Sequence, residues 1–181
     1  MNDKYKLLEN DTIEFLGRTF YRIEALKDFS NVKKGDKGGY IEKEQNLSFD
    51  NNAWVYDDAK VYDNAQVYGN AQVYDNAFIY SNAEVCGIAE VCGNAEVYGS
   101  AEVYEGKLND SSLIVIQNIG SECGILTAYK SQDEVIVTKG SFTGNLQKFA
   151  DKVEEVHGEN QYGKEYQLVI ELIKMRLGVE I

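Results

Sequence analysis

The sequence predicts a mainly β protein built around a central solenoid of short parallel strands. One hexapeptide is repeated nine times in the middle of the chain. The chain before the repeats alternates apolar and polar residues over short stretches, and the chain after them shows three strand-like and two helix-like segments. We therefore divide the chain into an N-terminal β-hairpin head at 1–45, the solenoid at 46–105, and a small C-terminal α+β domain at 106–181.

Composition limits the classes of partner. The 181 residues include 30 acidic residues and 18 Lys or Arg, so the net charge of -12 disfavours nucleic-acid polymers and anionic membranes. The three cysteines form no CxxC pair, which favours a reducing compartment. No apolar stretch has the length of a signal peptide or of a membrane span. We expect a soluble, cytoplasmic protein.

The head is expected to hold short strands, KYKLL, TIEFL and RTFYRIEAL, with NDT and LGRT as turns. A polar, glycine-rich loop, KDFSNVKKGDKGGY, then leads toward the repeats. Its lysines Lys33, Lys34 and Lys37 are the most concentrated positive charge in the chain, so a small anion is a candidate ligand there.

The residue types within the hexapeptide predict a short strand followed by a turn. Aligned on alanine, the repeats run from NAWVYD to SAEVYE, with Ala as the second residue of every repeat and Val or Ile two residues after it. Two small apolar residues separated by a polar one form a strand of about three residues with both side chains inward. Asn, Gly and Asp in the remaining slots tolerate the left-handed backbone of a turn. A turn every six residues gives a triangular coil of about 18 residues, so nine repeats predict about three coils.

This spacing resembles the hexapeptide-repeat proteins that fold as a left-handed parallel β-helix, in which an aliphatic residue is followed four positions later by a small one. Val55 with Ala59 and Val61 with Ala65 fit that pattern, as do their successors. The resemblance implies stacked coils and a homotrimer. The segment NLSFDN is expected to be a tenth, degenerate repeat with Leu47 and Phe49 inward.

Tyrosine follows the aliphatic residue in seven of the nine repeats. With 18 residues per coil this slot forms three columns: Tyr56, Tyr74 and Cys92; Tyr62, Tyr80 and Tyr98; Tyr68, Cys86 and Tyr104. Stacked rings would brace successive coils, or the complete column of Tyr62, Tyr80 and Tyr98 would offer planar faces to a ligand. Both interpretations stay open.

The outward strand positions begin with Trp54 and turn acidic along the solenoid. Between Asp50 and Glu105 there are ten acidic residues and one lysine. Glu84 and Glu102 should lie one coil apart in one column, which destabilises the pair unless a cation or a basic group compensates. The acids either keep the solenoid solvated or attract a basic partner.

The C-terminal part is expected to contain the strands SLIVIQ, GILTAYK and EVIVTK and two helices. The first helix has an apolar stripe and ends at Gly158, and the second runs from about Tyr162 to Leu177. The stripe consists of Leu146, Phe149, Ala150, Val153 and Val156. The only histidine, His157, ends the first helix, where it favourably meets the helix dipole; a general base or a ligand contact is the alternative.

Catalysis is not expected. Hexapeptide acyltransferases need a histidine base beside the coil, and carbonic anhydrases of this type need three histidines on a metal, whereas His157 is the only histidine and follows the repeats. The sequence also lacks GxSxG, P-loop and GxGxxG motifs. We predict no catalytic residue, no metal site and no cofactor.

The flanking segments carry a second resemblance. RTFYRIEALKDF and GDKGGYIEKEQNLS before the repeats, and IGSECGILTAYK and GSFTGNLQKFADKVEEVHGENQYGKEYQLVIELIKMRL after them, resemble a group of small phage and prophage proteins over essentially the whole chain. The resemblance implies a mobile-element origin, the host cytoplasm, and an accessory role such as interference with host defence. It supplies no catalytic residues.

The leading hypothesis is a non-enzymatic, homotrimeric binding protein that sequesters a small, nucleotide-like ligand at subunit junctions. The candidate contacts are Tyr62, Tyr80, Tyr98, Lys33, Lys34, Lys37, Tyr129, Lys130, Lys139 and His157. One alternative is an acidic interaction module that binds and inhibits a host protein. A second alternative is a hexapeptide acyltransferase.

Overall fold

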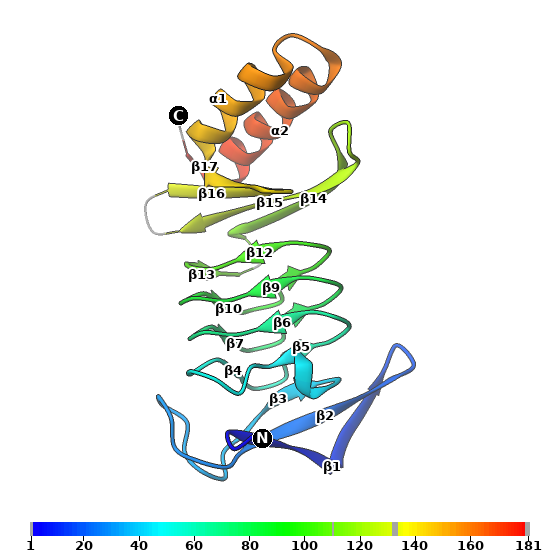
Figure 1. Ribbon diagram of the computed structural model, residues 1–181, viewed down its shortest axis with the longest axis vertical. Coiled ribbons are helices and arrows are strands. Elements are labelled where there is room, and N and C mark those ends of the chain that lie inside the picture. The colour runs from blue at the N-terminus through cyan, green and yellow to red at the C-terminus, as the bar shows by residue number, and fades with distance from the viewer. Residues whose placement is uncertain (1, 110, 132–133, 180–181) are drawn as a thin grey trace.

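The computed structural model describes residues 2–109, 111–131 and 134–179. It has a stack of short parallel strands in the middle, an antiparallel hairpin at one end, and a sheet covered by two helices at the other (Figure 1). The predicted mainly β architecture with a central solenoid is confirmed. None of the helices in the described part of the chain is long and apolar enough to cross a membrane.

The solenoid strands pair in parallel with the strand 18 residues further along, as Trp54 with Gln72 and Lys60 with Phe78 show. The strands are β4 (Trp54–Val55), β5 (Lys60–Val61), β6 (Gln66–Val67), β7 (Gln72–Val73), β8 (Phe78–Ile79), β9 (Glu84–Val85), β10 (Glu90–Val91), β11 (Glu96–Val97), β12 (Glu102–Val103) and β13 (Lys107–Leu108). Together with β3 (Lys37–Ile41) they form three faces: the head face (β3, β5, β8, β11), the tryptophan face (β4, β7, β10, β13) and the acidic face (β6, β9, β12).

The solenoid has about four turns, one more than the nine hexapeptides alone supply, because two of its faces each stack four strands. β3 (Lys37–Ile41) pairs in parallel with β5, and β13 pairs with β10. The sequence KGGYI was expected to be loop, and that prediction was wrong. The glycines permit close packing here: a Cβ at Gly39 would lie 2.7 Å from the carbonyl oxygen of Tyr56.

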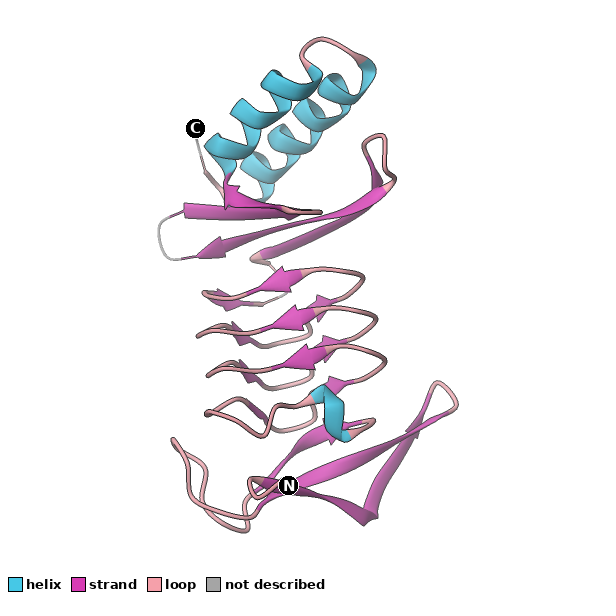
Figure 2. Cartoon of the chain, in the orientation of Figure 1, coloured by secondary structure: helices cyan, strands magenta, loops and turns pink. Residues whose placement is uncertain are grey.

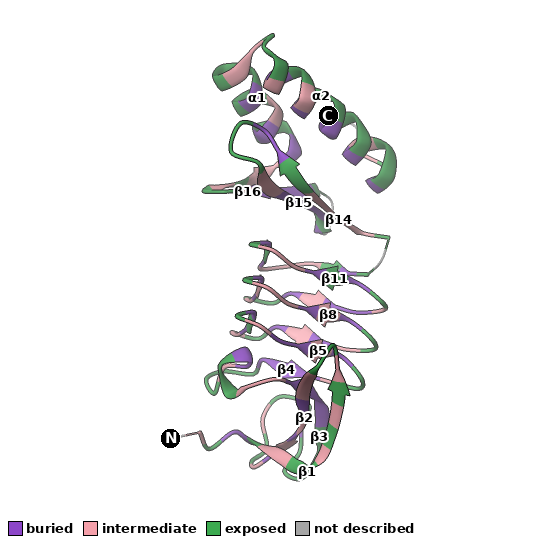
Figure 3. Ribbon diagram, turned by 90° about the vertical axis from the view of Figure 1, so that its right-hand side faces the viewer, coloured by how far each residue is buried: buried purple, intermediate pink, exposed green. Residues whose placement is uncertain are grey.

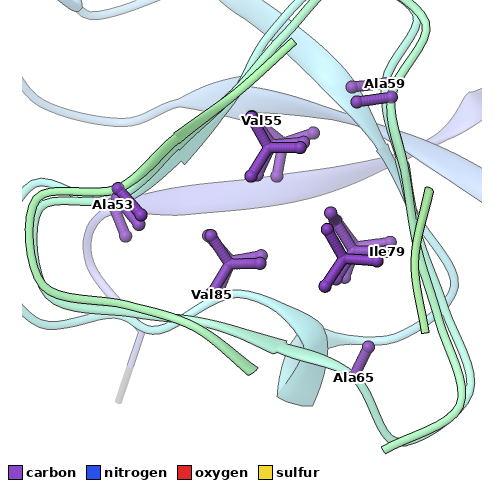
Figure 4. Packing of buried hydrophobic residues seen from close by; sticks show 14 of the residues in the cluster. Ala53, Val55, Ala59, Ala65, Ile79 and Val85 are labelled. Atoms are coloured by element: carbon purple, nitrogen blue, oxygen red, sulfur yellow. The ribbon is translucent and has the colours of Figure 1, made fainter. Parts of the chain in front are cut away.

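The predicted slots of the repeat are confirmed. The alanine and aliphatic side chains fill the interior, and Val55, Ile79 and Val85 point inward from three faces (Figure 4). The residue just before the first position of each repeat has a φ between 50° and 70°; these residues are Asn51, Asp57, Asp63, Gly69, Asp75, Ser81, Gly87, Gly93 and Gly99. At Gly87 a side chain would also collide with the carbonyl oxygen of Tyr104, so glycine is required there.

The head is a hairpin of β1 (Tyr5–Phe15) and β2 (Arg18–Ala25). β2 pairs with β3, so hairpin and head face form one six-stranded sheet (Figure 2). KYKLL and TIEFL were expected to be separate strands, but they form one strand with a register shift between Leu8 and Thr12. The residues NDT therefore lie at an irregularity within one strand and do not form a turn between two strands. Residues that favour turns also favour such irregularities.

The head closes the first end of the solenoid core. Trp54, expected to point outward, is only 1% exposed because the rings of Phe29 and Tyr5 cover it at centroid distances of 5.3 and 6.2 Å. Lys4 is fully buried, and its Nζ donates hydrogen bonds to the carbonyl oxygens of Ser48 (3.0 Å) and Ala53 (2.6 Å). Buried carbonyls at the end of the solenoid thereby find a donor.

The C-terminal domain closes the other end. Its antiparallel sheet contains β14 (Leu113–Ile119), β15 (Gly124–Ser131), β16 (Glu134–Lys139) and β17 (Phe142–Asn145), the last not expected from the sequence. Tyr129 and Ile136 belong to the solenoid core, whereas Leu126 and Val137 belong to the core beneath the helices. The sheet lies between the solenoid and the helices (Figure 3), so its residues contribute to both cores.

The two predicted helices are confirmed as α1 (Leu146–His157) and α2 (Gln161–Leu177). Asn145 caps α1 by accepting a hydrogen bond from the backbone of Lys148, and Asn160 caps α2 in the same way. The α1 stripe packs on the sheet except at its end, because Val156 is 57% exposed.

Candidate functional site

A groove of about 660 Å³ lies at the start of the acidic face. It lies where the 3-10 turn η1 (Glu44–Asn46) and the following segment meet β6 and β9. Its lining residues are Glu44, Gln45, Leu47, Ser48, Phe49, Asp50, Gln66, Val67, Tyr68 and Glu84. We call it the acidic groove.

An interruption of the repeat creates this groove. Leu47 pairs with Val67, 20 positions on, whereas Val55 pairs with Val73, 18 positions on, so the chain between Leu47 and Val55 holds two extra residues. Leu47 fills an inward slot as expected, but Phe49 was expected inward and is 40% exposed. The extra residues make the corner bulge and leave the Phe49 ring on the rim of the groove.

The buried side chain of Asn46 holds the rim in place. Its amide nitrogen donates to the carbonyl oxygens of Asp63 (3.2 Å) and Ala65 (2.9 Å), and its amide oxygen accepts from the backbone of Lys43 (2.9 Å). These bonds tie η1 to the turn before β6. The acidic side chains of the rim are therefore carried by a fixed backbone.

Negative charge gathers on the acidic face without compensation. Glu84 and Glu102 stand directly opposite each other in the β9–β12 pair. The Tyr68 hydroxyl donates to Glu84 at 2.7 Å, and this hydrogen bond is the main reason why the pKa of Tyr68 is raised. Within the described residues, no lysine or arginine forms an ion pair with either glutamate.

The other two faces do not place one glutamate opposite another: Glu90 stands between Gln72 and Lys107, and Glu96 stands opposite Phe78. On the tryptophan face Glu90 receives a hydrogen bond from Tyr74 (2.9 Å) and lies 3.5 Å from the Lys107 ammonium. On the head face Glu96 receives one from Tyr80 (3.0 Å). In each case the tyrosine hydroxyl donates a hydrogen bond to the carboxylate of the glutamate 16 residues further along the chain. The sequence did not predict this contact.

The predicted tyrosine column forms a stack. The ring of Tyr80 lies 5.1 Å from that of Tyr62 and 5.2 Å from that of Tyr98, with interplanar angles of 9° and 11°. The first ring is buried against Phe20 of the head, and the Arg18 guanidinium lies 5.8 Å from its centre. This geometry braces successive coils and joins the head to them.

The head lysines are largely engaged by acids of the head. Lys33 lies 3.2 Å from Asp28, and Lys37 lies 2.6 Å from Asp11. The backbone nitrogen of Lys34 also donates to Asp28. These carboxylates compete with any anion that would bind to the loop.

The remaining candidates lie in the C-terminal domain, at the other end of the molecule. Tyr129 is fully buried, its hydroxyl has no hydrogen-bond partner among the described residues, and burial raises its pKa, so it offers no face to a ligand. Lys130 is exposed on β15. Lys139 and His157 line one cleft together, although they are distant in sequence.

Comparison of the sequence with models of known protein families and with curated proteins gives no match. Among the residues that the structure describes, no group of three or more His, Cys, Asp or Glu side chains is placed to hold a metal ion. The arrangement offers a rigid surface with carboxylates, aromatic rings and hydroxyls.

Proposed function

We propose that this protein is a non-enzymatic binding module whose acidic groove binds a basic segment of a partner protein. The observation that carries the proposal is the uncompensated column of Glu84 and Glu102 next to the groove. Lysine or arginine side chains would supply the missing positive charge, and their stems would pack on Phe49. The partner's basic segment would thus contact the carboxylates and the exposed aromatic ring at the same time.

The proposal follows the alternative of an acidic interaction module and not the small nucleotide-like ligand. Lys33, Lys34 and Lys37 lie in the head, whereas Lys130 and Lys139 lie in the domain at the other end, so one protomer does not gather them around one ligand. The resemblance to small phage proteins makes a host protein in the cytoplasm the natural partner, and inhibition of that protein the natural consequence.

Charge reversal in the groove tests this proposal. In the full-length protein, Glu84→Lys is expected to weaken binding of a fluorescent lysine- and arginine-rich peptide by roughly tenfold or more, because one attraction becomes a repulsion. Fluorescence anisotropy at two salt concentrations measures the affinity and its electrostatic part.

Glu96→Lys is the matched control. It occupies the same repeat slot, accepts a tyrosine hydrogen bond in the same way, and changes the net charge equally, but it lies on the head face. We expect it to weaken binding much less. Equal weakening by both variants would mean that the peptide senses only the net charge of -12, and the groove proposal would be abandoned.

We further propose that the chain self-associates, with the homotrimer as the state that the hexapeptide resemblance implies. α2 leaves an apolar stripe uncovered: Leu168 and Met175 are 74% and 73% exposed, and Leu172 lies between them at helical spacing. A stripe of this kind is typical of a helix that packs against a partner.

The double variant Leu168→Glu, Leu172→Glu is expected to shift the assembly to monomers in sedimentation equilibrium. Ile88→Glu is the control, because Ile88 is 63% exposed on a solenoid turn. Dissociation by Ile88→Glu but not by the double variant would place the interface on the solenoid and contradict the assignment to α2.

A further inference from the structure

A second cleft, separate from the acidic groove, lies in the C-terminal domain between the helices and the sheet. It has a volume of about 270 Å³. The β14–β15 and β16–β17 turns, the second half of α1, and α2 surround it. Its lining residues are Ser121, Glu122, Lys139, Phe142, Phe149, Lys152, Val153, Val156, His157 and Tyr166.

Aromatic rings in mutual contact line this cleft. The ring of Phe149 lies 5.3 Å from that of Phe142 and 5.6 Å from that of Tyr166. The ring of Tyr166 in turn lies 5.4 Å from the imidazole of His157. These four rings form a continuous row in which Phe149 and Tyr166 are nearly buried, at 4% and 5% exposed, whereas Phe142 and His157 are partly accessible. The accessible rings can contact a planar aromatic guest.

Lys139 gives the cleft its charge. Its side chain is 10% exposed, and the nearest carboxylate, Glu122, lies 3.6 Å away on a side chain that is 80% exposed. Among the described residues Glu122 is the one carboxylate within ion-pair distance of this ammonium group, which therefore retains hydrogen-bond donors for a second anion. Lys152 adds a positive charge at the same cleft, although it also binds Glu155 at 2.9 Å.

We propose that this cleft binds a small planar aromatic anion, with the ring against Phe142 and His157, which are the more accessible rings of the cleft, and the anionic group on Lys139. The volume is near the lower end for ligand pockets and holds a ligand of roughly one ring. An aromatic carboxylate and an aryl phosphate share this chemistry. The inference does not rest on the acidic groove, which has the opposite charge.

Titration calorimetry of the full-length protein with benzoate and phenyl phosphate tests the inference. We expect saturable binding of at least one probe at one site per chain, and the tighter probe identifies the anionic group. Benzamide, which has the same ring without the charge, should bind at least roughly tenfold more weakly, the size expected for a hydrogen-bonded charge in a sheltered site. Absence of binding by both anions, or equal binding of benzamide, would overturn the proposal.

Two variants assign the site. Lys139→Met keeps the apolar stem and should weaken anion binding by roughly tenfold, whereas Lys130→Met on the neighbouring strand should leave it unchanged. Glu122→Gln removes the competing carboxylate and should strengthen binding. Affinities unaffected by Lys139→Met, or lowered equally by Lys130→Met, would show that the anions bind elsewhere.

Discussion

Replacing Trp54 by alanine is expected to lower the free energy of unfolding by about 3 to 5 kcal/mol. The indole is 1% exposed and packs edge-on against Phe29 and Tyr5, where the head covers the first coil. Its removal leaves a cavity between two parts of the fold that cannot readily collapse, because the strands beside it are fixed by pairing with the next coil. Urea denaturation followed by circular dichroism measures the loss.

Gln72→Ala is the matched control for this prediction. Gln72 pairs with Trp54 in the same column, one coil further from the head, and is only partly buried. Its replacement is expected to change the free energy of unfolding by less than about 0.5 kcal/mol, as is usual for surface positions. A similar loss of stability in both variants would show that any truncation in this column is destabilising, and that packing of the head on Trp54 is not the cause.

Stability is expected to fall steeply above about pH 10, because several tyrosines have a raised pKa in the folded protein. Burial raises the pKa of Tyr5 and of Tyr129, and burial with weaker hydrogen-bond effects raises the pKa of Tyr74 to about 12. The unfolded tyrosines lose their protons near pH 10, so the unfolded state is favoured from there upward. The two nearly inaccessible rings, Tyr5 and Tyr129, together account for about 2 kcal/mol between about pH 10 and 11.

At lower pH, Lys4 has the opposite effect and makes the free energy of unfolding increase with pH. Burial lowers the pKa of Lys4 to about 8. Between about pH 8 and 10 the unfolded chain holds this proton and the folded chain does not, so stability rises by up to about 1.4 kcal/mol per pH unit. The combined curve should pass through a maximum near pH 10.

Urea denaturation at a series of pH values between about 7 and 11 measures this curve. Lys4→Met is expected to abolish the rise, and Tyr5→Phe to reduce the fall, whatever their effects on absolute stability. A curve that is flat from about pH 8 to 10 in the unmodified protein would contradict the burial of a charged Lys4.

The sequence indicated part of the candidate site and missed the rest. The acidic column of Glu84 and Glu102 follows from the coil length, so it could be predicted. The exposure of Phe49 could not, because Leu47 and Phe49 in NLSFDN have the spacing of the two inward residues of the repeat, and only strand pairing shows the two extra residues after Leu47. The grouping of Lys139 with His157 depends on how α1 folds back over the sheet, which no local pattern encodes.

By itself the sequence determined the solenoid: the slots, the 18-residue coil, the positive-φ turns and the stacked tyrosines all follow from a six-residue period, since strand geometry converts a period into columns. The tertiary structure alone decided which outward positions are covered. Trp54 and Gln72 occupy the same slot, yet one is core and the other surface, because the head packs over only one of them. The tertiary structure likewise made KGGYI a strand. Gly38 and Gly39 allow this strand to pack closely against Val55 and Tyr56, each 17 positions further along the chain, and no local pattern shows that contact.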